Sequence, residues 1–138
     1  MTERAGSSTG QRSAPRIAFR ADAGHLLGSG HVMRCLALAD ALHDIGASCV
    51  FIHRERPGHM AETIAARGHH VRLLSAPNHP GDSSLEATYE QDVSEMLATL
   101  RDQQPEWVVV DHYGLDSRWE TDTRNCVAPT LAIEDLPN

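Results

Sequence analysis

The sequence of 138 residues contains no lysine, and its 12 basic residues are arginines scattered singly along the chain. A P-loop needs a lysine to reach the phosphates of a nucleotide, so this kind of nucleotide site is excluded. The net charge of −7, without a cluster of basic residues, argues against nucleic acid as a partner. No apolar run approaches the roughly 20 residues of a membrane-spanning helix, and the N-terminus lacks the apolar core of a secretory signal. We therefore expect neither a membrane nor nucleic acid among its partners.

Cysteine is scarce as well. The three cysteines, Cys35, Cys49 and Cys126, are an odd number without CxxC spacing, which indicates reduced thiols in a cytoplasmic protein. Histidine is more frequent, with nine residues, but none stands in an HExxH motif or another paired helical spacing. We therefore expect a cytoplasmic protein that holds no metal and needs no cofactor.

The pattern of apolar residues predicts one α/β domain after a flexible tail. Residues 1–15 are rich in Ser, Thr, Gly and Arg without periodicity, which is typical of a flexible segment. From 16 to 138, short apolar strands alternate with segments of helical spacing, as in a parallel sheet covered on both faces. We expect about five strands, at 17–19, 48–53, 70–74, 107–110 and 130–133, and helices at 31–45, 60–67, 85–103 and 117–125.

The most informative stretch combines the first strand, a glycine loop and the first helix. Gly28, Ser29 and Gly30 lead directly into His31, where the helical pattern begins. Glycines let a backbone turn tightly and approach a ligand, and the first N–H groups of a helix attract an anion. The loop therefore predicts a phosphate-sized site. The helix itself has an apolar stripe, followed by Gly46 as its C-cap, and the stripe consists of Cys35, Leu38, Ala39, Leu42 and Ile45.

Ligands of parallel sheets bind beyond the carboxyl ends of the strands. That rule selects three loops, at 21–30, at 111–116 and after Glu134. The residues that we expect to bind or act there are Arg20, Asp22, Gly28, Ser29, Gly30, His31, Arg34, Asp111, His112 and Tyr113. The glycines do not form a dinucleotide-binding fingerprint, because Met33 occupies the position of its third glycine.

Each candidate also has a structural interpretation. His31 at the helix start should stay neutral near pH 7, as a general base must, but its ring could instead cap the helix or pack under the loop. Arg34 would meet the helix dipole unfavourably unless an anion is bound; alternatively it pairs with Asp22 or is solvated. Asp111 could be an acid–base group or cap a turn, and Tyr113 could bind substrate or cover the core. The aromatic residues expected in the core are Phe19, Trp107 and Trp119.

Two separated blocks resemble one enzyme family. They are Arg20-Ala-Asp22 with Gly28-Ser-Gly30-His-Val-Met-Arg-Cys-Leu-Ala-Leu-Ala-Asp40, and Val109-Val-Asp-His-Tyr-Gly-Leu115. Both look like motifs of the UDP-2,4-diacetamido-2,4,6-trideoxy-β-L-altropyranose hydrolases of pseudaminic acid biosynthesis, which are similar in build to GT-B glycosyltransferases. The resemblance covers nearly all of the chain after the tail, and only the N-terminal half of the family's architecture.

The resemblance implies two Rossmann-like domains with the active site between them. It implies that His31 activates water for attack at the anomeric carbon of a UDP-sugar, that Tyr113 is an active-site tyrosine, and that the glycine loop lies near the diphosphate. It implies inversion at the anomeric carbon without a metal. A separate C-terminal domain, which would hold most of the uridine and ribose, is then the expected partner.

Three hypotheses about function remain open at this point. The chain is the N-terminal domain of a UDP-sugar hydrolase, or half of a GT-B nucleotide-sugar glycosyltransferase, or a non-catalytic module that binds an anion or a partner domain through the same loop. The product separates the first two, because a hydrolase releases free sugar and a transferase makes a glycoside. We expect the isolated chain to be poorly active in either case, since half a cleft does not orient a substrate.

Overall fold

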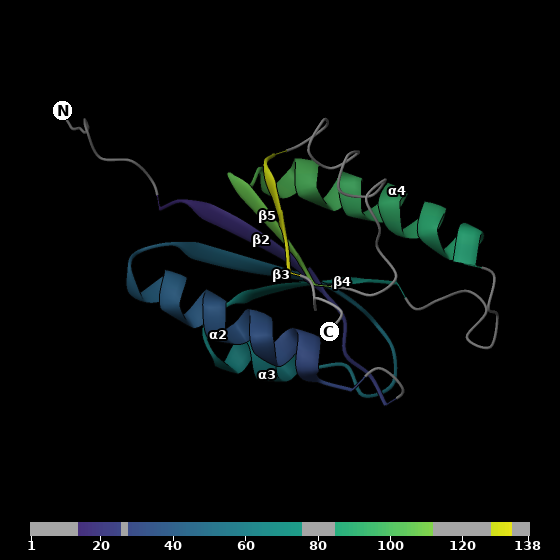
Figure 1. Cartoon of the computed structure of the whole chain (residues 1–138), viewed down its shortest axis with the longest axis horizontal. Coiled ribbons are helices and arrows are strands. Elements are labelled where there is room, and N and C mark those ends of the chain that lie inside the picture. Colours follow the sequence, from purple (N-terminus) through teal and green to yellow (C-terminus); the bar gives the residue numbers. More distant parts are fainter. Residues whose placement is uncertain (1–13, 26–27, 76–84, 112–127, 134–138) are drawn as a thin grey trace, which may run out of the picture.

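The computed structural model describes residues 14–25, 28–75, 85–111 and 128–133, with only the backbone for 85–92. In this part of the chain, five strands form one parallel sheet (Figure 1). Its spatial order is β4-β3-β2-β5-β6. The strands are β2 (Arg16–Ala21), β3 (Ser48–Arg54), β4 (His70–Leu74), β5 (Trp107–Asp111) and β6 (Thr130–Ala132), and the helices are α2 (Gly30–Asp44), α3 (Ala61–Ala66) and α4 (Leu85–Gln103).

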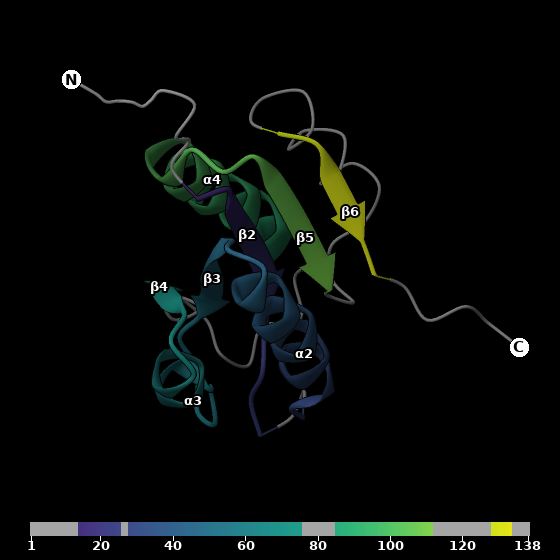
Figure 2. The same cartoon turned by 90° about the vertical axis from the view of Figure 1, so that its left-hand side faces the viewer.

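Helices cover both faces of the sheet, as the short apolar strands predict. Figures 1 and 2 show α2 and α3 on one face and α4 on the other. Successive strand residues point to opposite faces. Phe19 and Phe51 therefore pack under α2, stacked with ring centroids 4.8 Å apart, whereas Val50 and Ile52 pack with Met96 of α4. The predicted α/β sheet of five parallel strands is confirmed.

The bounds of α2 differ slightly from the prediction. The helix begins at Gly30 rather than at His31, because the carbonyl of Ser29 already accepts the N–H of Met33 at 2.9 Å. Ile45 was expected on the apolar stripe, but it is 82% exposed. It lies just past the last helical residue, where the helical period no longer sets its direction, and Gly46 follows with φ +102°. The face that α2 buries consists of Val32, Cys35, Leu36 and Ala39.

Two of the three expected core aromatics fall among the described residues. Phe19 is fully buried, as predicted. The prediction for Trp107 is wrong, because its side chain is 49% exposed. Trp107 is the first residue of β5, so it lies at the end of the strand, where fewer neighbours surround it. Among the described helices, none combines the length and the apolar character that crossing a membrane requires.

Candidate functional site

The sheet order creates a topological switch point at the carboxyl ends of β2 and β5, and we refer to the space beyond these two strand ends as the crevice. The chain runs from β2 outward to β3 and β4, then crosses back to β5 on the other side of β2. Connections leave the two adjacent strands in opposite directions, and ligands of open parallel sheets bind at such a point. Ala21 of β2 lies in register with Asp111 of β5, so both strands end together.

The glycine loop brings the start of α2 to this crevice. Gly24 and Gly28 exchange backbone hydrogen bonds of 3.3 and 2.8 Å, which closes the loop on itself. Gly28 has φ +77°, a conformation that glycine adopts without strain. Ser29 is the N-cap but its side chain makes no capping hydrogen bond, and the first turn of α2 carries no acidic residue. The first N–H groups of the helix therefore present a positive end toward the crevice.

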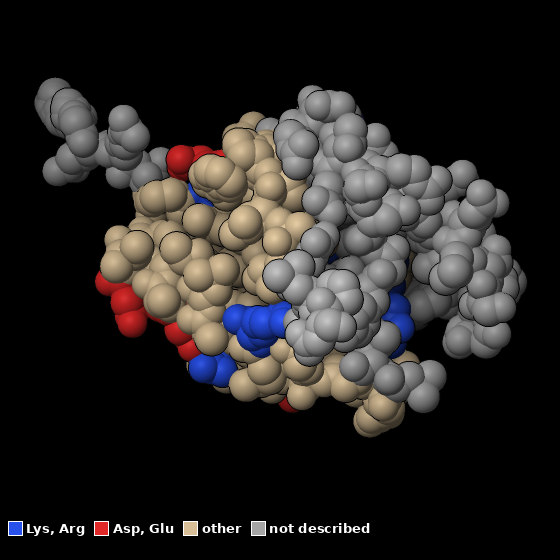
Figure 3. All heavy atoms as spheres, in the orientation of Figure 1, with Lys and Arg blue, Asp and Glu red and all other residues tan. Residues whose placement is uncertain are grey.

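Three predicted site residues meet in this crevice. The imidazole Nδ1 of His31 lies 2.5 Å from Oδ1 of Asp111. The guanidinium of Arg34 binds the same carboxylate with two hydrogen bonds, from Nε at 2.6 Å and from Nη2 at 2.8 Å. Asp111 is 1% exposed and His31 11%, whereas Arg34 keeps 37% of its side chain exposed. The space-filling view shows basic side chains at the surface in the region of α2 (Figure 3).

The carboxylate of Asp111 determines which ring nitrogen of His31 carries the proton. Burial raises the pKa of Asp111, but the hydrogen bonds from Arg34 and His31 outweigh burial and hold its pKa below the usual value. An ionised carboxylate only accepts hydrogen bonds, so Nδ1 of His31 must carry the proton. In the neutral ring, Nε2 is then the basic nitrogen, which is the arrangement that a histidine base needs.

The environment of Arg34 differs from both expected alternatives. Arg34 is the fifth residue of α2, so it lies just beyond the first turn, because the helix begins one residue earlier than predicted. Its ion pair is with Asp111 and not with Asp22. The reason is the alternation along the strands: Asp111 shares its face with Val109 under α2, whereas Asp22 shares its face with Ala18 on the α4 side.

Arg20 and Asp22 bind one another inside the protein. Two hydrogen bonds join the guanidinium and the carboxylate, at 2.5 and 3.0 Å, and each side chain is 1% exposed. Asp22 also accepts the backbone N–H of Arg54 at 2.8 Å, and Arg20 donates to the carbonyl of Ile52 at 3.4 Å. The pair thus ties the end of β2 to β3. Its predicted role in substrate binding stays a prediction, but these contacts favour a structural role.

Two buried side chains near the crevice, His53 and Cys35, are held in states that do not suit catalysis. Nδ1 of His53 donates to the carbonyl of Ala21 at 2.8 Å, and its Nε2 accepts the N–H of Met60 at 3.0 Å. Burial lowers the pKa of His53, so the ring is neutral and joins β2, β3 and the start of α3. Burial, reinforced by Asp111, raises the pKa of the Cys35 thiol to about 12, so Cys35 is no nucleophile.

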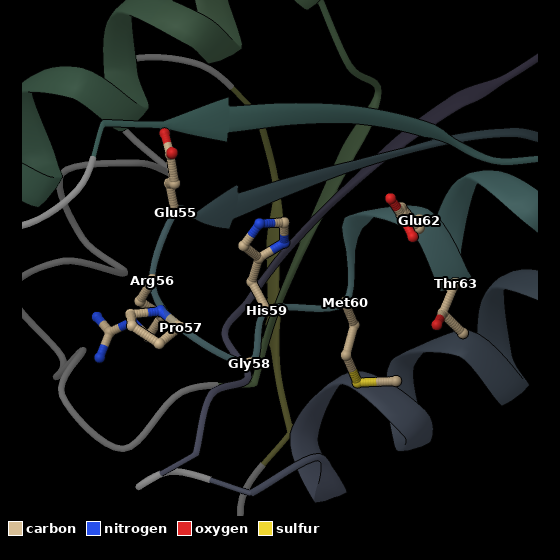
Figure 4. A pocket seen from close by; sticks show the side chains of 8 residues that line it. All are labelled: Glu55, Arg56, Pro57, Gly58, His59, Met60, Glu62 and Thr63. Carbon is tan, nitrogen blue, oxygen red and sulfur yellow. The ribbon is translucent and has the colours of Figure 1, made fainter.

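The structure also contains a cavity that the sequence analysis missed. Its volume is about 580 Å³, and it lies where the chain leaves β3 and enters α3 (Figure 4). The rule about carboxyl ends of strands applies to β3 as much as to β2, so the same signal could have selected residues 55–60.

His112 and Tyr113 lie outside the described residues, and their predicted roles stay predictions. Among the residues that the structure describes, no group of three or more His, Cys, Asp or Glu side chains is arranged to hold a metal ion.

Comparisons with solved structures agree on the fold. Two crystal structures of the C-terminal domain of a hydrogenase from Pyrococcus furiosus match with TM-scores of 0.61 and 0.62, at 11% and 12% sequence identity. These matches cover 88% and 95% of this chain and 91% and 100% of theirs. A glycosyltransferase from Rickettsia africae ESF-5 matches with a TM-score of 0.56 at 11% identity. The match covers 92% of the present chain but only 32% of the glycosyltransferase. No protein-family model and no curated protein matches the sequence.

The chain is therefore an α/β protein of the Rossmann-like, doubly wound class. At identities of 11–12%, the similarity establishes the fold alone. The match to the glycosyltransferase spans about a third of that enzyme.

Proposed function

We propose that this chain is the N-terminal half of a nucleotide-sugar enzyme, and specifically of a UDP-sugar hydrolase in which His31 activates the attacking water. The observation that supports this most is the hydrogen bond between Nδ1 of His31 and Asp111 at the crevice between β2 and β5. A buried carboxylate on Nδ1 leaves Nε2 as the basic nitrogen and stabilises the imidazolium that forms when Nε2 takes a proton.

In the proposed reaction, Nε2 of His31 takes a proton from water as the water oxygen attacks the anomeric carbon. The bond between that carbon and the phosphate oxygen breaks, UDP leaves with the electron pair, and the configuration inverts. The positive end of α2 and the guanidinium of Arg34 stabilise the negative charge on the leaving diphosphate. Asp111 is a positioning residue, because it acts through His31 and Arg34.

A second domain is part of the proposal. In this chain, one sheet edge provides only one side of the crevice. Orienting a substrate between two domains is expected to lower the reaction barrier by roughly 7–11 kcal/mol. We therefore expect little UDP release by this chain alone, and turnover when a C-terminal domain completes the cleft.

The test uses a protein that carries both domains, with UDP release from the trideoxy-altropyranose substrate as readout. His31→Asn should lower turnover by roughly 10²–10⁴-fold and leave substrate binding nearly unchanged. The matched control is His70→Asn, an exposed histidine on the edge strand β4. Parental turnover of the His31 variant would exclude His31 as the base.

A glycosyltransferase half is the second candidate, and it is favoured by the shared fold with the Rickettsia africae enzyme. Analysis of the product separates the two functions, because a transferase yields a glycoside of the acceptor and no free sugar. If the two-domain protein binds an anion or a partner domain but shows no turnover, the third hypothesis, a non-catalytic binding module, is favoured.

A further inference from the structure

The cavity after β3 is built from polar side chains around a central histidine. Figure 4 shows His59 between Glu55 on one side and Glu62 of α3 on the other. Met60 and Pro57 add apolar surface to the lining. The volume of about 580 Å³ falls within the range of sites that hold small molecules.

The charges of this cavity disfavour a phosphate and suit a neutral ligand. Glu55 and Glu62 are exposed carboxylates, and the guanidinium of Arg56 turns away from them in Figure 4, with Nη2 3.9 Å from Asp22. A phosphate would meet both carboxylates, and like charges repel. Hydroxyl groups, in contrast, donate well to carboxylates.

The cavity also provides a donor for a ligand. Nδ1 of His59 accepts the N–H of Ala61 at 3.3 Å, so the neutral ring carries its proton on Nε2, which is free to donate toward the cavity that His59 lines. Carboxylate acceptors, an N–H donor and apolar patches together fit the hydroxyls, acyl oxygens and C–H faces of a sugar.

The cavity wall is in direct contact with the glycine loop that precedes α2. The N–H of His25 donates to the carbonyl of Pro57 at 3.1 Å. A Cβ placed on Gly58 would lie 2.7 Å from the backbone N of His25, and one on Gly24 would lie 2.9 Å from Cδ of Arg56. The two loops therefore touch backbone to backbone, and the cavity adjoins the loop that leads to His31.

We propose that this cavity is the sugar subsite of the nucleotide-sugar site, and that it binds a neutral, hydroxylated monosaccharide ring while the diphosphate lies at the start of α2. This inference rests on the proposed function, because it takes His31 and the start of α2 as the place of the bond that breaks. The positive groups at the start of α2 and the carboxylates of the cavity together determine the orientation of the substrate. Its anionic diphosphate meets Arg34 and the helix, and its uncharged sugar meets Glu55 and Glu62.

The test is amide NMR shift mapping on this chain with three probes: UDP, UDP-N-acetylglucosamine and free N-acetylglucosamine. UDP should perturb only residues 28–34. UDP-N-acetylglucosamine should perturb residues 58–63 as well, and should bind about fivefold or more tightly than UDP, because hydrogen bonds to charged groups are added. Glu62→Gln should remove at least half of this gain in affinity for UDP-N-acetylglucosamine and leave the affinity for UDP unchanged. Glu106→Gln, an exposed glutamate at the opposite end of the sheet just before β5, should change neither.

The outcomes separate this inference from the proposed function. If UDP-N-acetylglucosamine perturbs the same residues as UDP and binds equally, the sugar subsite is overturned and the diphosphate site stands. Shifts at 58–63 with free N-acetylglucosamine, but none at 28–34 with UDP, would support a sugar site here and contradict the proposed diphosphate site. If no probe perturbs residues 58–63 at millimolar concentration, the sugar subsite is overturned, and turnover in the protein that carries both domains still tests the proposed function.

Discussion

Two arginine–aspartate pairs lie at the same edge of the sheet, on opposite faces. Arg20 and Asp22 form the first, and Arg34 and Asp111 the second; each arginine makes two hydrogen bonds to its carboxylate. The arginine of the first pair is 1% exposed, and that of the second is 37% exposed. We call them the closed pair and the open pair. The same chemistry thus occurs once inside the protein and once at its surface.

The difference between the pairs is what surrounds them. The closed pair makes further hydrogen bonds to backbone groups of Ile52 and Arg54, which tie it to β3. The open pair has the imidazole of His31 beside it, with Nδ1 2.5 Å from Oδ1 of Asp111. Residue types do not distinguish a structural ion pair from a candidate site; the third partner and the exposure do.

The largest effect should follow from breaking the closed pair. Asp22→Ala removes the carboxylate that binds the buried guanidinium of Arg20 through two hydrogen bonds. Removal of one partner of a buried ion pair costs about 3–5 kcal/mol of the free energy of unfolding. Asp102→Ala is the matched control, because Asp102 is 65% exposed and pairs with an exposed arginine, and it should cost about 0–1 kcal/mol. Urea unfolding measures both. Equal costs would contradict the distinction between buried and exposed pairs.

The contact between the loop after β3 and the glycine loop before α2 should make the protein sensitive to substitution at Gly58. Gly58 has φ +85° and would place a Cβ against His25, whereas Gly68 has φ +92° and open space around it. Alanine at Gly68 should cost about 1–2 kcal/mol from backbone strain alone. Alanine at Gly58 should cost about 1–3 kcal/mol more, because the two loops must separate. Urea unfolding compares the two variants. If both lose the same stability, contact with His25 does not constrain the loop.

Breaking the open pair should have a smaller effect than breaking the closed pair. Asp111→Asn should lower the free energy of unfolding by about 1–3 kcal/mol. The half-exposed Arg34 can turn into water, but the buried amide of the variant makes weaker hydrogen bonds than the carboxylate.

The dependence of stability on pH should also change in Asp111→Asn. Since the folded pKa of Asp111 is lowered, its contribution is present above the ordinary value of 3.8 and is lost as the pH falls through the folded pKa. Urea midpoints measured from pH 6 to 2.5 should therefore fall less steeply for Asp111→Asn. A steeper fall would contradict the lowered pKa.

The smallest expected effect concerns His53 beside the closed pair. Burial lowers its folded pKa below the ordinary value of 6.5, so the unfolded chain binds a proton that the folded protein excludes. The free energy of unfolding should therefore decrease as the pH falls below about 6.5. His53→Gln should remove this part of the pH dependence, as measured by thermal unfolding between pH 7.5 and 5.5. An unchanged slope would show that His53 is protonated equally in both states.

Local patterns were sufficient to predict most of the elements. The bounds of β4 and α4 agree with the predicted ranges 70–74 and 85–103. Gly46 follows α2 with positive φ, in agreement with its predicted place at the C-terminus of the helix, and Gly68 follows α3 in the same way. These features depend on residues close in the chain, which is why spacing alone can indicate them. The same reasoning failed for Ile45 and Trp107, whose burial depends on what packs over the ends of their elements.

The sequence by itself therefore determined the alternation of strands and helices, the parallel sheet, and a glycine loop at the start of a helix near Asp111. Tertiary structure alone decided that Arg34 pairs with Asp111, 77 residues away, and that Arg20 turns inward to Asp22. It also decided that loop 55–60 lines a cavity beside the glycine loop. The physical reason is that the face to which a strand end points, and the partner that meets it there, depend on strand register and on helix position. Neither is encoded by the spacing of neighbouring residues.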